Sequence, residues 1–123
     1  MQKLNQSYIK SVVKKALEED LKPSGDITTK LIKFKNKKTK AQIVAKQNGV
    51  ISGLDFCKTA FKLVGKETVF ISKVKDGSKV KKNKVIAEIK AKTKTILIAE
   101  RTALNFLNHA SGISTLTNLF VQK

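Results

Sequence analysis

Arginine is almost absent from this sequence, although the chain is strongly basic. Only Arg101 among the 26 lysine and arginine residues is an arginine, and the formal net charge is +17. A guanidinium offers a planar fork of five donors that holds a carboxylate or phosphate through two bonds, which a lysine ammonium cannot do. Arg101 is therefore the first candidate binding residue, and the simpler alternative is a solvated surface position.

Aromatic residues are also scarce, which bears on the partners of so basic a chain. They make up 6% of the residues, and tryptophan is missing. A surface with this charge attracts nucleic acid, acidic proteins and phosphorylated ligands. Base stacking and bidentate recognition of guanine, however, rely on aromatic and arginine side chains. The composition therefore argues against a nucleic-acid partner and favours lysine-rich solvated faces.

Cysteine occurs only once, and long apolar runs are missing as well. The single Cys57 excludes an internal disulfide and any metal site built from several cysteines. No apolar run approaches the ~20 residues of a membrane span, and residues 1–15 lack the apolar core of a secretory signal. We predict a cytoplasmic protein without a membrane partner. A chain of 123 residues, 41% of them hydrophobic, has room for one ordinary folded domain.

Motifs that would build a catalytic centre are absent too. There is no glycine-rich phosphate loop, no nucleophile elbow, no pair of carboxylates spaced for acid–base chemistry and no His/Cys/acid cluster at metal spacing. His109 is interpreted as a surface histidine. Cys57 is interpreted as a packed core thiol, because no motif provides it with a base. The sequence thus predicts no catalytic residue and no metal ligand in this chain.

The residues that are present alternate between helical and extended patterns. Ser7 is placed to cap a first helix, and Gly65 is placed to end a second one. Glycine and asparagine turns separate short stretches with the period-2 alternation of strands. This order predicts an α+β fold, an α/β sandwich in which helices cover one face of an antiparallel sheet. The predicted helices span residues 7–21, 53–64 and 97–110, and the predicted strands span residues 40–47, 68–74 and 85–89.

Two polar features belong to the first helix and its end. Glu18, Glu19 and Asp20 crowd its C-terminal turn, where the helix dipole disfavours negative charge, so we expect this end to be either locally strained or partnered by nearby lysines. Asp26 follows Pro23 in a turn that stops the helix, and its side chain is placed to bond the local backbone.

The helical pattern of residues 97–110 decides where Arg101 points. At 100° per residue, five apolar residues form one stripe, and Arg101, Asn105 and Asn108 fall on the opposite side. If the stripe packs on the core of the chain, Arg101 points toward solvent or another surface. The stripe consists of Ala99, Ala103, Phe106, Leu107 and Ala110.

The last residues predict a further helix that nothing follows. Helical spacing restarts after Ser111-Gly112 through Ile113, Leu116 and Phe120. We therefore divide the chain into a sandwich domain of residues 1–110 and the start of a connection at residues 111–123. An uncovered apolar side of that helix predicts either a fragment of a longer chain or a dimer partner that covers it.

Several motifs together resemble the N-terminal part of quinolinate phosphoribosyltransferase, the decarboxylating nicotinate-nucleotide pyrophosphorylase. The resemblance covers essentially the whole chain, and the stretch from Glu100 to Thr115 is its most specific part. The motifs are Asp20-Leu21, Gly25-Asp26-Ile27-Thr28-Thr29, Gly49-Val50-Ile51-Ser52-Gly53, Asp76-Gly77 with Val80, Glu100-Arg101-Thr102-Ala103-Leu104-Asn105-Phe106-Leu107 and Ser111-Gly112-Ile113-Ser114-Thr115.

The resemblance implies a fold, a reaction and a role for the arginine. Family members have an N-terminal α/β sandwich followed by an α/β barrel, and they assemble as homodimers in which one subunit's N-terminal domain covers the other's barrel. They convert quinolinate and phosphoribosyl pyrophosphate to nicotinate mononucleotide, CO2 and pyrophosphate in NAD biosynthesis, with Mg²⁺ bound beside the sugar donor in the barrel. The resemblance implies that Arg101 binds a substrate carboxylate in the neighbouring subunit's site.

The barrel is absent from this chain, so the resemblance also implies that the chain alone is an inactive fragment or one piece of a split enzyme. Three other interpretations remain open. A molybdenum-transport-associated relative of the same superfamily would share these motifs. A lipoyl-like carrier would share the turns at Val74–Val80 and Val85–Ile89, although no lysine stands in the modified tip of such carriers. A basic nucleic-acid-binding module is the third.

Overall fold

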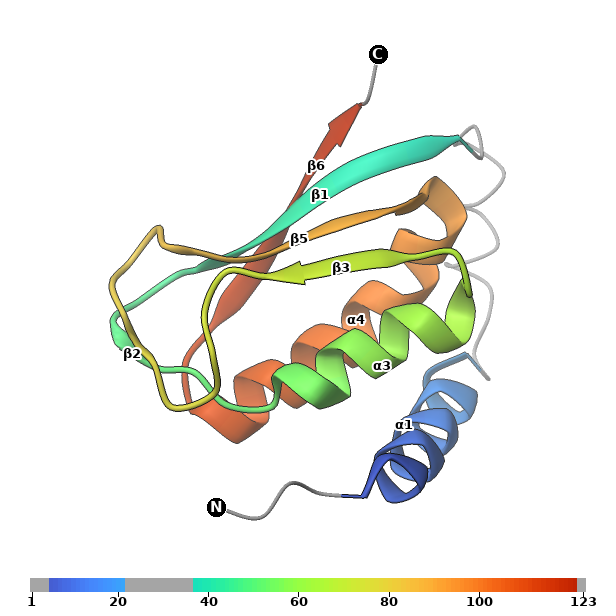
Figure 1. The fold of residues 1–123 in the computed structure, drawn as a ribbon, viewed down its shortest axis with the longest axis horizontal. Coiled ribbons are helices and arrows are strands. Elements are labelled where there is room, and N and C mark those ends of the chain that lie inside the picture. The colour runs from blue at the N-terminus through green and yellow to red at the C-terminus, as the bar shows by residue number, and fades with distance from the viewer. Residues whose placement is uncertain (1–4, 22–36, 122–123) are drawn as a thin grey trace.

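A four-stranded antiparallel sheet forms the centre of the chain. The computed structural model describes residues 5–21 and 37–121. The strands of the sheet lie in the order β3-β5-β1-β6, and β2 and β4 form a separate two-stranded ribbon (Figure 1). The strands are β1 (Lys38–Ala45), β2 (Gly49–Val50), β3 (Val69–Ser72), β4 (Lys79–Val80), β5 (Val85–Lys92) and β6 (Thr115–Val121).

The helices lie on one side of this sheet. These are α1 (Gln6–Leu21), α3 (Leu54–Val64) and α4 (Thr93–Ser111). Helices α3 and α4 run side by side beneath the sheet, and α1 packs against both of them farther from it (Figure 1). The prediction of an α+β sandwich with helices on one face of an antiparallel sheet is therefore confirmed. Within the described ranges, no helix is long and apolar enough to cross a membrane.

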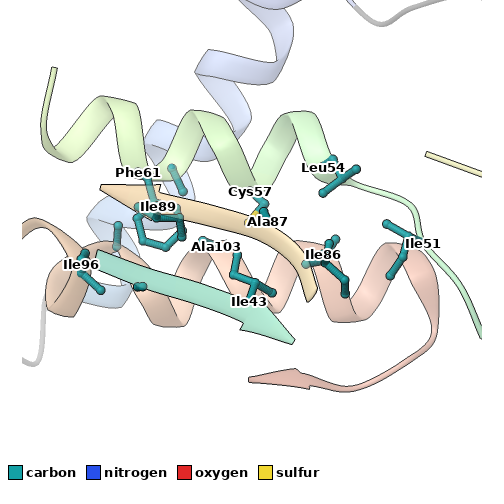
Figure 2. Close-up of a cluster of buried hydrophobic side chains, with 14 of the residues drawn as sticks. Ile43, Ile51, Leu54, Cys57, Phe61, Ile86, Ala87, Ile89, Ile96 and Ala103 are labelled. Carbon is teal, nitrogen blue, oxygen red and sulfur yellow. The ribbon is translucent and has the colours of Figure 1, made fainter. Parts of the chain in front are cut away.

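The core lies between the sheet and the two helices, as Figure 2 shows. Residues Ala41, Ile43 and Ala45 of β1 alternate along the strand and are buried on one face. Ile89 of β5 and Phe61 of α3 are also fully buried, in the same hydrophobic cluster (Figure 2). Apolar alternation in the strands and helical spacing in α3 thus bury complementary faces against one another.

Among the described residues, no helix lies on the opposite face of the sheet. Glu88 of β5 lies there beside two lysines, with its carboxylate 2.9 Å from Lys73 Nζ and 3.6 Å from Lys40 Nζ. The hydrogen bond from Lys73, together with the charges of both lysines, lowers the pKa of Glu88 from its ordinary value. Val69 and Ile71 of β3 are 47% and 40% exposed. This uncovered face is therefore mixed, with ion pairs beside apolar residues.

The helix predicted at the end of the chain is wrong. Thr115–Val121 forms strand β6, which pairs with β1 from Ala45↔Thr115 to Thr39↔Val121. Three apolar residues at helical spacing were a weak signal, and the threonine-rich segment favours extended backbone. Pairing with the edge of β1 satisfies the backbone N–H and C=O groups of this segment. The division at residue 110 stays a prediction, and β6 belongs to the same sheet as β1, β3 and β5.

The start of α1 also differs from the prediction by two residues. Asn5, and not Ser7, supplies the side-chain oxygen at this end, and it accepts a hydrogen bond of 2.7 Å from the Ser7 backbone N–H. Asparagine is as good a capping residue as serine. The turn predicted at Asp26 lies outside the described residues.

Candidate functional site

Helix α4 carries Arg101, and its first turn is anchored to the sheet. The helix begins directly after β5, without an intervening loop. The Thr93 backbone N–H and hydroxyl both donate to the Lys37 carbonyl, at 2.8 and 3.0 Å. The Thr93 and Thr39 hydroxyl oxygens lie 2.6 Å apart, in a buried hydrogen bond. These bonds fix the direction in which α4 leaves the sheet, and therefore where its exposed side chains lie.

The faces of α4 match the predicted stripe at most positions. Ala99, Ala103 and Leu107 are fully buried against the core, and Arg101 is exposed. The prediction that Arg101 points away from the core is confirmed. Ala110 is exposed, contrary to the prediction, because it lies in the last turn of the helix.

Phe106, the remaining residue of the predicted stripe, is half-buried. Its ring stacks on Phe56 of α3 with the ring centroids 5.2 Å apart and the planes 17° from parallel. This contact ties α3 to α4 next to the exposed polar residues of α4.

A cleft of about 570 Å³ lies between α1 and α4, one turn away from Arg101. Asn105 and His109 follow Arg101 at four-residue intervals, are exposed like it, and line this cleft. The three form a polar stripe on the outer side of α4. The lining residues are Ala16, Glu19 and Asp20 of α1, and Thr102, Asn105, Phe106, Asn108 and His109 of α4.

One hydrogen bond joins two residues that line the cleft, one from each helix. The Thr102 hydroxyl donates to an Asp20 carboxylate oxygen, and Thr102 is 1% exposed. The prediction for the acidic end of α1 is strain or pairing with lysines, and the partner that the structure describes for Asp20 is the Thr102 hydroxyl. No local pattern indicates this contact, because Thr102 lies 82 residues away from Asp20 in the chain.

Asn108 has a structural role that its position on the helical wheel did not indicate. Its side-chain oxygen accepts hydrogen bonds from the backbone N–H and the hydroxyl of Thr115, at 2.8 and 2.5 Å. Gly112 ends the helix in the left-handed conformation, with φ 72°, and its N–H donates to the Asn108 carbonyl. Asn108 thus holds the turn that directs the chain from α4 into β6.

Cys57, the other residue considered in the sequence, lies in the core and apart from this stripe. Cys57 is fully buried, and burial raises the pKa of its thiol far above the ordinary value, which agrees with a packed core thiol. Among the described residues, no group of three or more His, Cys, Asp and Glu residues is placed to hold a metal ion. What the described site offers is an exposed guanidinium on α4, flanked by an amide and an imidazole.

The fold and the site together define an open-faced α+β sandwich that presents one arginine outward. The family model described as "Quinolinate phosphoribosyl transferase, N-terminal domain" matches residues 26–111. The chain belongs to this family. The resemblance found in the sequence motifs is therefore confirmed.

Relatives and solved structures agree with this assignment. The chain is 40% identical over 116 residues to a probable nicotinate-nucleotide pyrophosphorylase of Methanocaldococcus jannaschii. The aligned residues make up 94% of this chain and 39% of the relative. It is 34% identical over 109 residues to quinolinate phosphoribosyltransferase 1b of Nicotiana tabacum, covering 89% of this chain and 31% of the relative.

Among solved structures, the NadC protein of Streptococcus pyogenes is similar, with a TM-score of 0.79 and 32% identity over 89% of this chain and 39% of that one. The nicotinate-nucleotide pyrophosphorylase of Francisella tularensis gives a TM-score of 0.77 at 30% identity, over 86% of this chain and 37% of that one. The chain thus spans between about a third and two fifths of the length of these proteins.

Proposed function

We propose that this chain supplies the N-terminal domain of a quinolinate phosphoribosyltransferase, which makes nicotinate mononucleotide, CO2 and pyrophosphate in NAD biosynthesis. The relatives that support this are named as quinolinate phosphoribosyltransferases or nicotinate-nucleotide pyrophosphorylases. A molybdenum-transport-associated relative of the same superfamily is the alternative, and the names of these relatives favour the transferase.

The observation that carries the proposal is the position of Arg101. This single arginine is exposed on a helix whose first turn is hydrogen-bonded to the sheet, and its neighbours Ala99 and Ala103 are buried. A guanidinium held in this way can bind a carboxylate bidentately at a surface that docks on α4. We propose that Arg101 binds a carboxylate of quinolinate in the site of a neighbouring subunit.

The electrostatics of the chain suit both proposed substrates. Quinolinate is a dianion and phosphoribosyl pyrophosphate is a polyanion, and the net charge of +17 attracts both over a Debye length. Because the described residues offer no cluster for a metal, the Mg²⁺ that we expect with the sugar donor would be held by residues outside this domain. We therefore assign this domain the binding of substrate, and we assign the transfer chemistry to a barrel domain in a homodimer.

The exchange Arg101→Lys tests the role of the guanidinium. It is made in a hybrid in which this chain replaces the matching part of the Methanocaldococcus jannaschii relative. Removing one partner of a desolvated ion pair costs about 3–5 kcal/mol, and lysine keeps the charge but loses the bidentate geometry. We expect kcat/KM for quinolinate to fall about a hundredfold or more in steady-state assays of nicotinate mononucleotide formation.

A matched control is Lys79→Arg, an exchange of the same two side chains at an exposed position of β4. It should leave kcat/KM within about twofold, because surface charges contribute little. Both hybrids should give the same elution volume in size-exclusion chromatography. Near wild-type turnover by a folded Arg101→Lys hybrid would overturn the assignment.

A further inference from the structure

A second cleft, of about 540 Å³, separates α1 from α3 and is lined by lysines. Lys10 reaches it from α1, and Lys58, Lys62 and Lys66 reach it from α3 and the residues just after it. We call it the lysine groove. Its other lining residues are Gln6, Ser7, Asp55, Thr59 and Leu63. With four lysines and one aspartate, the lining carries a net charge of +3.

The spacing of these lysines concentrates charge on one side of α3. Lys58 and Lys62 are four residues apart in α3, so they lie on the same face about 6 Å apart, and Lys66 follows just after the end of the helix. Like charges at this spacing destabilise a helix by a few tenths of a kcal/mol per pair. Both lysines within α3 face the groove, so the bare protein carries a repulsion there that a bound anion would relieve.

The lysines of the groove are not neutralised by the described carboxylates. Asp55 is the one carboxylate in the lining, and no salt bridge joins it to a lysine within the described ranges. The uncovered face of the sheet differs, because Lys40 and Lys73 both pair with Glu88 there. The lysine groove is thus a concave surface with unmatched positive charge, and not simply another lysine-rich face.

The chemistry of the lining selects a class of ligand. Lysine binds phosphate as a point charge, without the bidentate geometry that carboxylate recognition by arginine uses. The lining contains no aromatic side chain on which a nucleic-acid base would stack. Its volume falls in the range of small-molecule sites. We propose that the lysine groove binds a compact anion carrying two or more phosphate groups.

This site is separate from the one proposed for quinolinate. The lysine groove shares no lining residue with the cleft between α1 and α4, and it includes neither Arg101 nor any residue of α4. Binding here needs no barrel and no neighbouring subunit. The proposal therefore goes beyond the proposed function, and either can fail without the other.

The test is calorimetric titration of the purified 123-residue chain with inorganic tripolyphosphate, orthophosphate and citrate. We expect tripolyphosphate to bind at least tenfold more tightly than the other two, with an affinity that falls as salt is raised. The double variant Lys58→Gln/Lys62→Gln should weaken tripolyphosphate binding at least tenfold. Its far-UV circular dichroism should match that of the unchanged chain. If it fails to fold, Lys10→Gln/Lys66→Gln is expected to give the same loss.

The control is Lys79→Gln/Lys81→Gln, which lowers the net charge equally at two exposed lysines outside the groove. It should retain tripolyphosphate binding within about twofold. Equal losses in the two double variants would show attraction by the overall charge only and would overturn the proposal. Equal affinity for citrate would overturn the phosphate class. A single-stranded oligonucleotide that binds more tightly through the same lysines would show a nucleic-acid surface instead.

Discussion

Gly53 lies where the segment after β2 passes beneath the last turns of α4. Its backbone has φ 92°, in the left-handed region that side chains disfavour. A Cβ atom there would lie 2.9 Å from the Cβ of Ala110 and 3.1 Å from the Phe106 carbonyl oxygen. Glycine at this position therefore lets α4 approach the start of α3 closely. The contact helps to hold the helix that carries Arg101.

The exchange Gly53→Ala should lower the free energy of unfolding by about 2–4 kcal/mol. About 1–2 kcal/mol comes from the left-handed backbone, and the rest comes from the crowding against α4. Gly77→Ala is a matched control, because Gly77 also has φ 92° but no atom lies within 4 Å of its added Cβ. Urea unfolding should show a loss of about 1–2 kcal/mol for the control. Equal losses would contradict the close approach of α4.

Glu88 makes a pH-dependent contribution to stability. Its folded-state pKa lies below the ordinary value of 4.5, and the hydrogen bond from Lys73 is the main cause. The ion pairs therefore stabilise the fold above about pH 4.5, and this contribution is lost as the pH falls through the folded-state pKa. Glu88→Gln should unfold at a lower temperature than the unchanged chain at pH 7. The two melting temperatures should converge as the pH falls through the folded-state pKa of Glu88, and a constant difference would contradict this role.

At the scale of elements, α1 is joined to α4 by packing and by a partly buried hydrogen bond. Ile9, Val13 and Leu17 of α1 belong to the hydrophobic core, and Asp20 accepts the bond from Thr102 at the end of the helix. The acidic end of α1 would be unfavourable for an isolated helix. The bond from Thr102 offsets part of that cost, so the position of α1 over α4 depends on this contact.

Thr102→Val removes the hydroxyl but keeps the shape of the buried side chain. We expect the free energy of unfolding to fall by about 1–2 kcal/mol, since the lost bond has a carboxylate acceptor. Thr59→Val is the control, because the exposed Thr59 hydroxyl donates only to the Asp55 carbonyl of its own helix. Its effect in urea unfolding should stay within about 0.5 kcal/mol. A Thr102→Val variant as stable as this control would contradict the role of the bond.

At the scale of the whole molecule, the described residues form a four-stranded antiparallel sheet with helices packed on one face. They contain an outward arginine and no cluster of metal ligands. The sheet has one face covered by helices and one face with exposed Val69 and Ile71. In the function that we propose, the transfer chemistry depends on a barrel domain.

The purified 123-residue chain should therefore form no nicotinate mononucleotide from quinolinate and phosphoribosyl pyrophosphate. The physical reason is that transfer requires the reacting atoms to be held in line, and one substrate-binding arginine does not achieve this. Product is measured by chromatography against a full-length relative assayed in parallel. Formation of product above the no-enzyme background would contradict the assignment of the chemistry to the barrel.

Local patterns were enough to predict the sandwich, the presence of β1 and α3, and the outward direction of Arg101. Each of these depends on the period of a strand or a helix, which neighbouring residues set. The same reasoning failed for Thr115–Val121, because a short apolar spacing is ambiguous and the open edge of β1 decides its structure. It also did not indicate the contact of Asp20 with Thr102.

The sequence by itself determined the class of fold, the family and the exposed position of the single arginine, because periodicity and motifs are read along the chain. The tertiary structure alone decided which distant residues meet. It placed Thr102 against Asp20, aligned Lys10 with the lysines of α3, and added β6 to the sheet. Such contacts join residues far apart in the chain, so their energies depend on the packed arrangement of elements and not on local spacing.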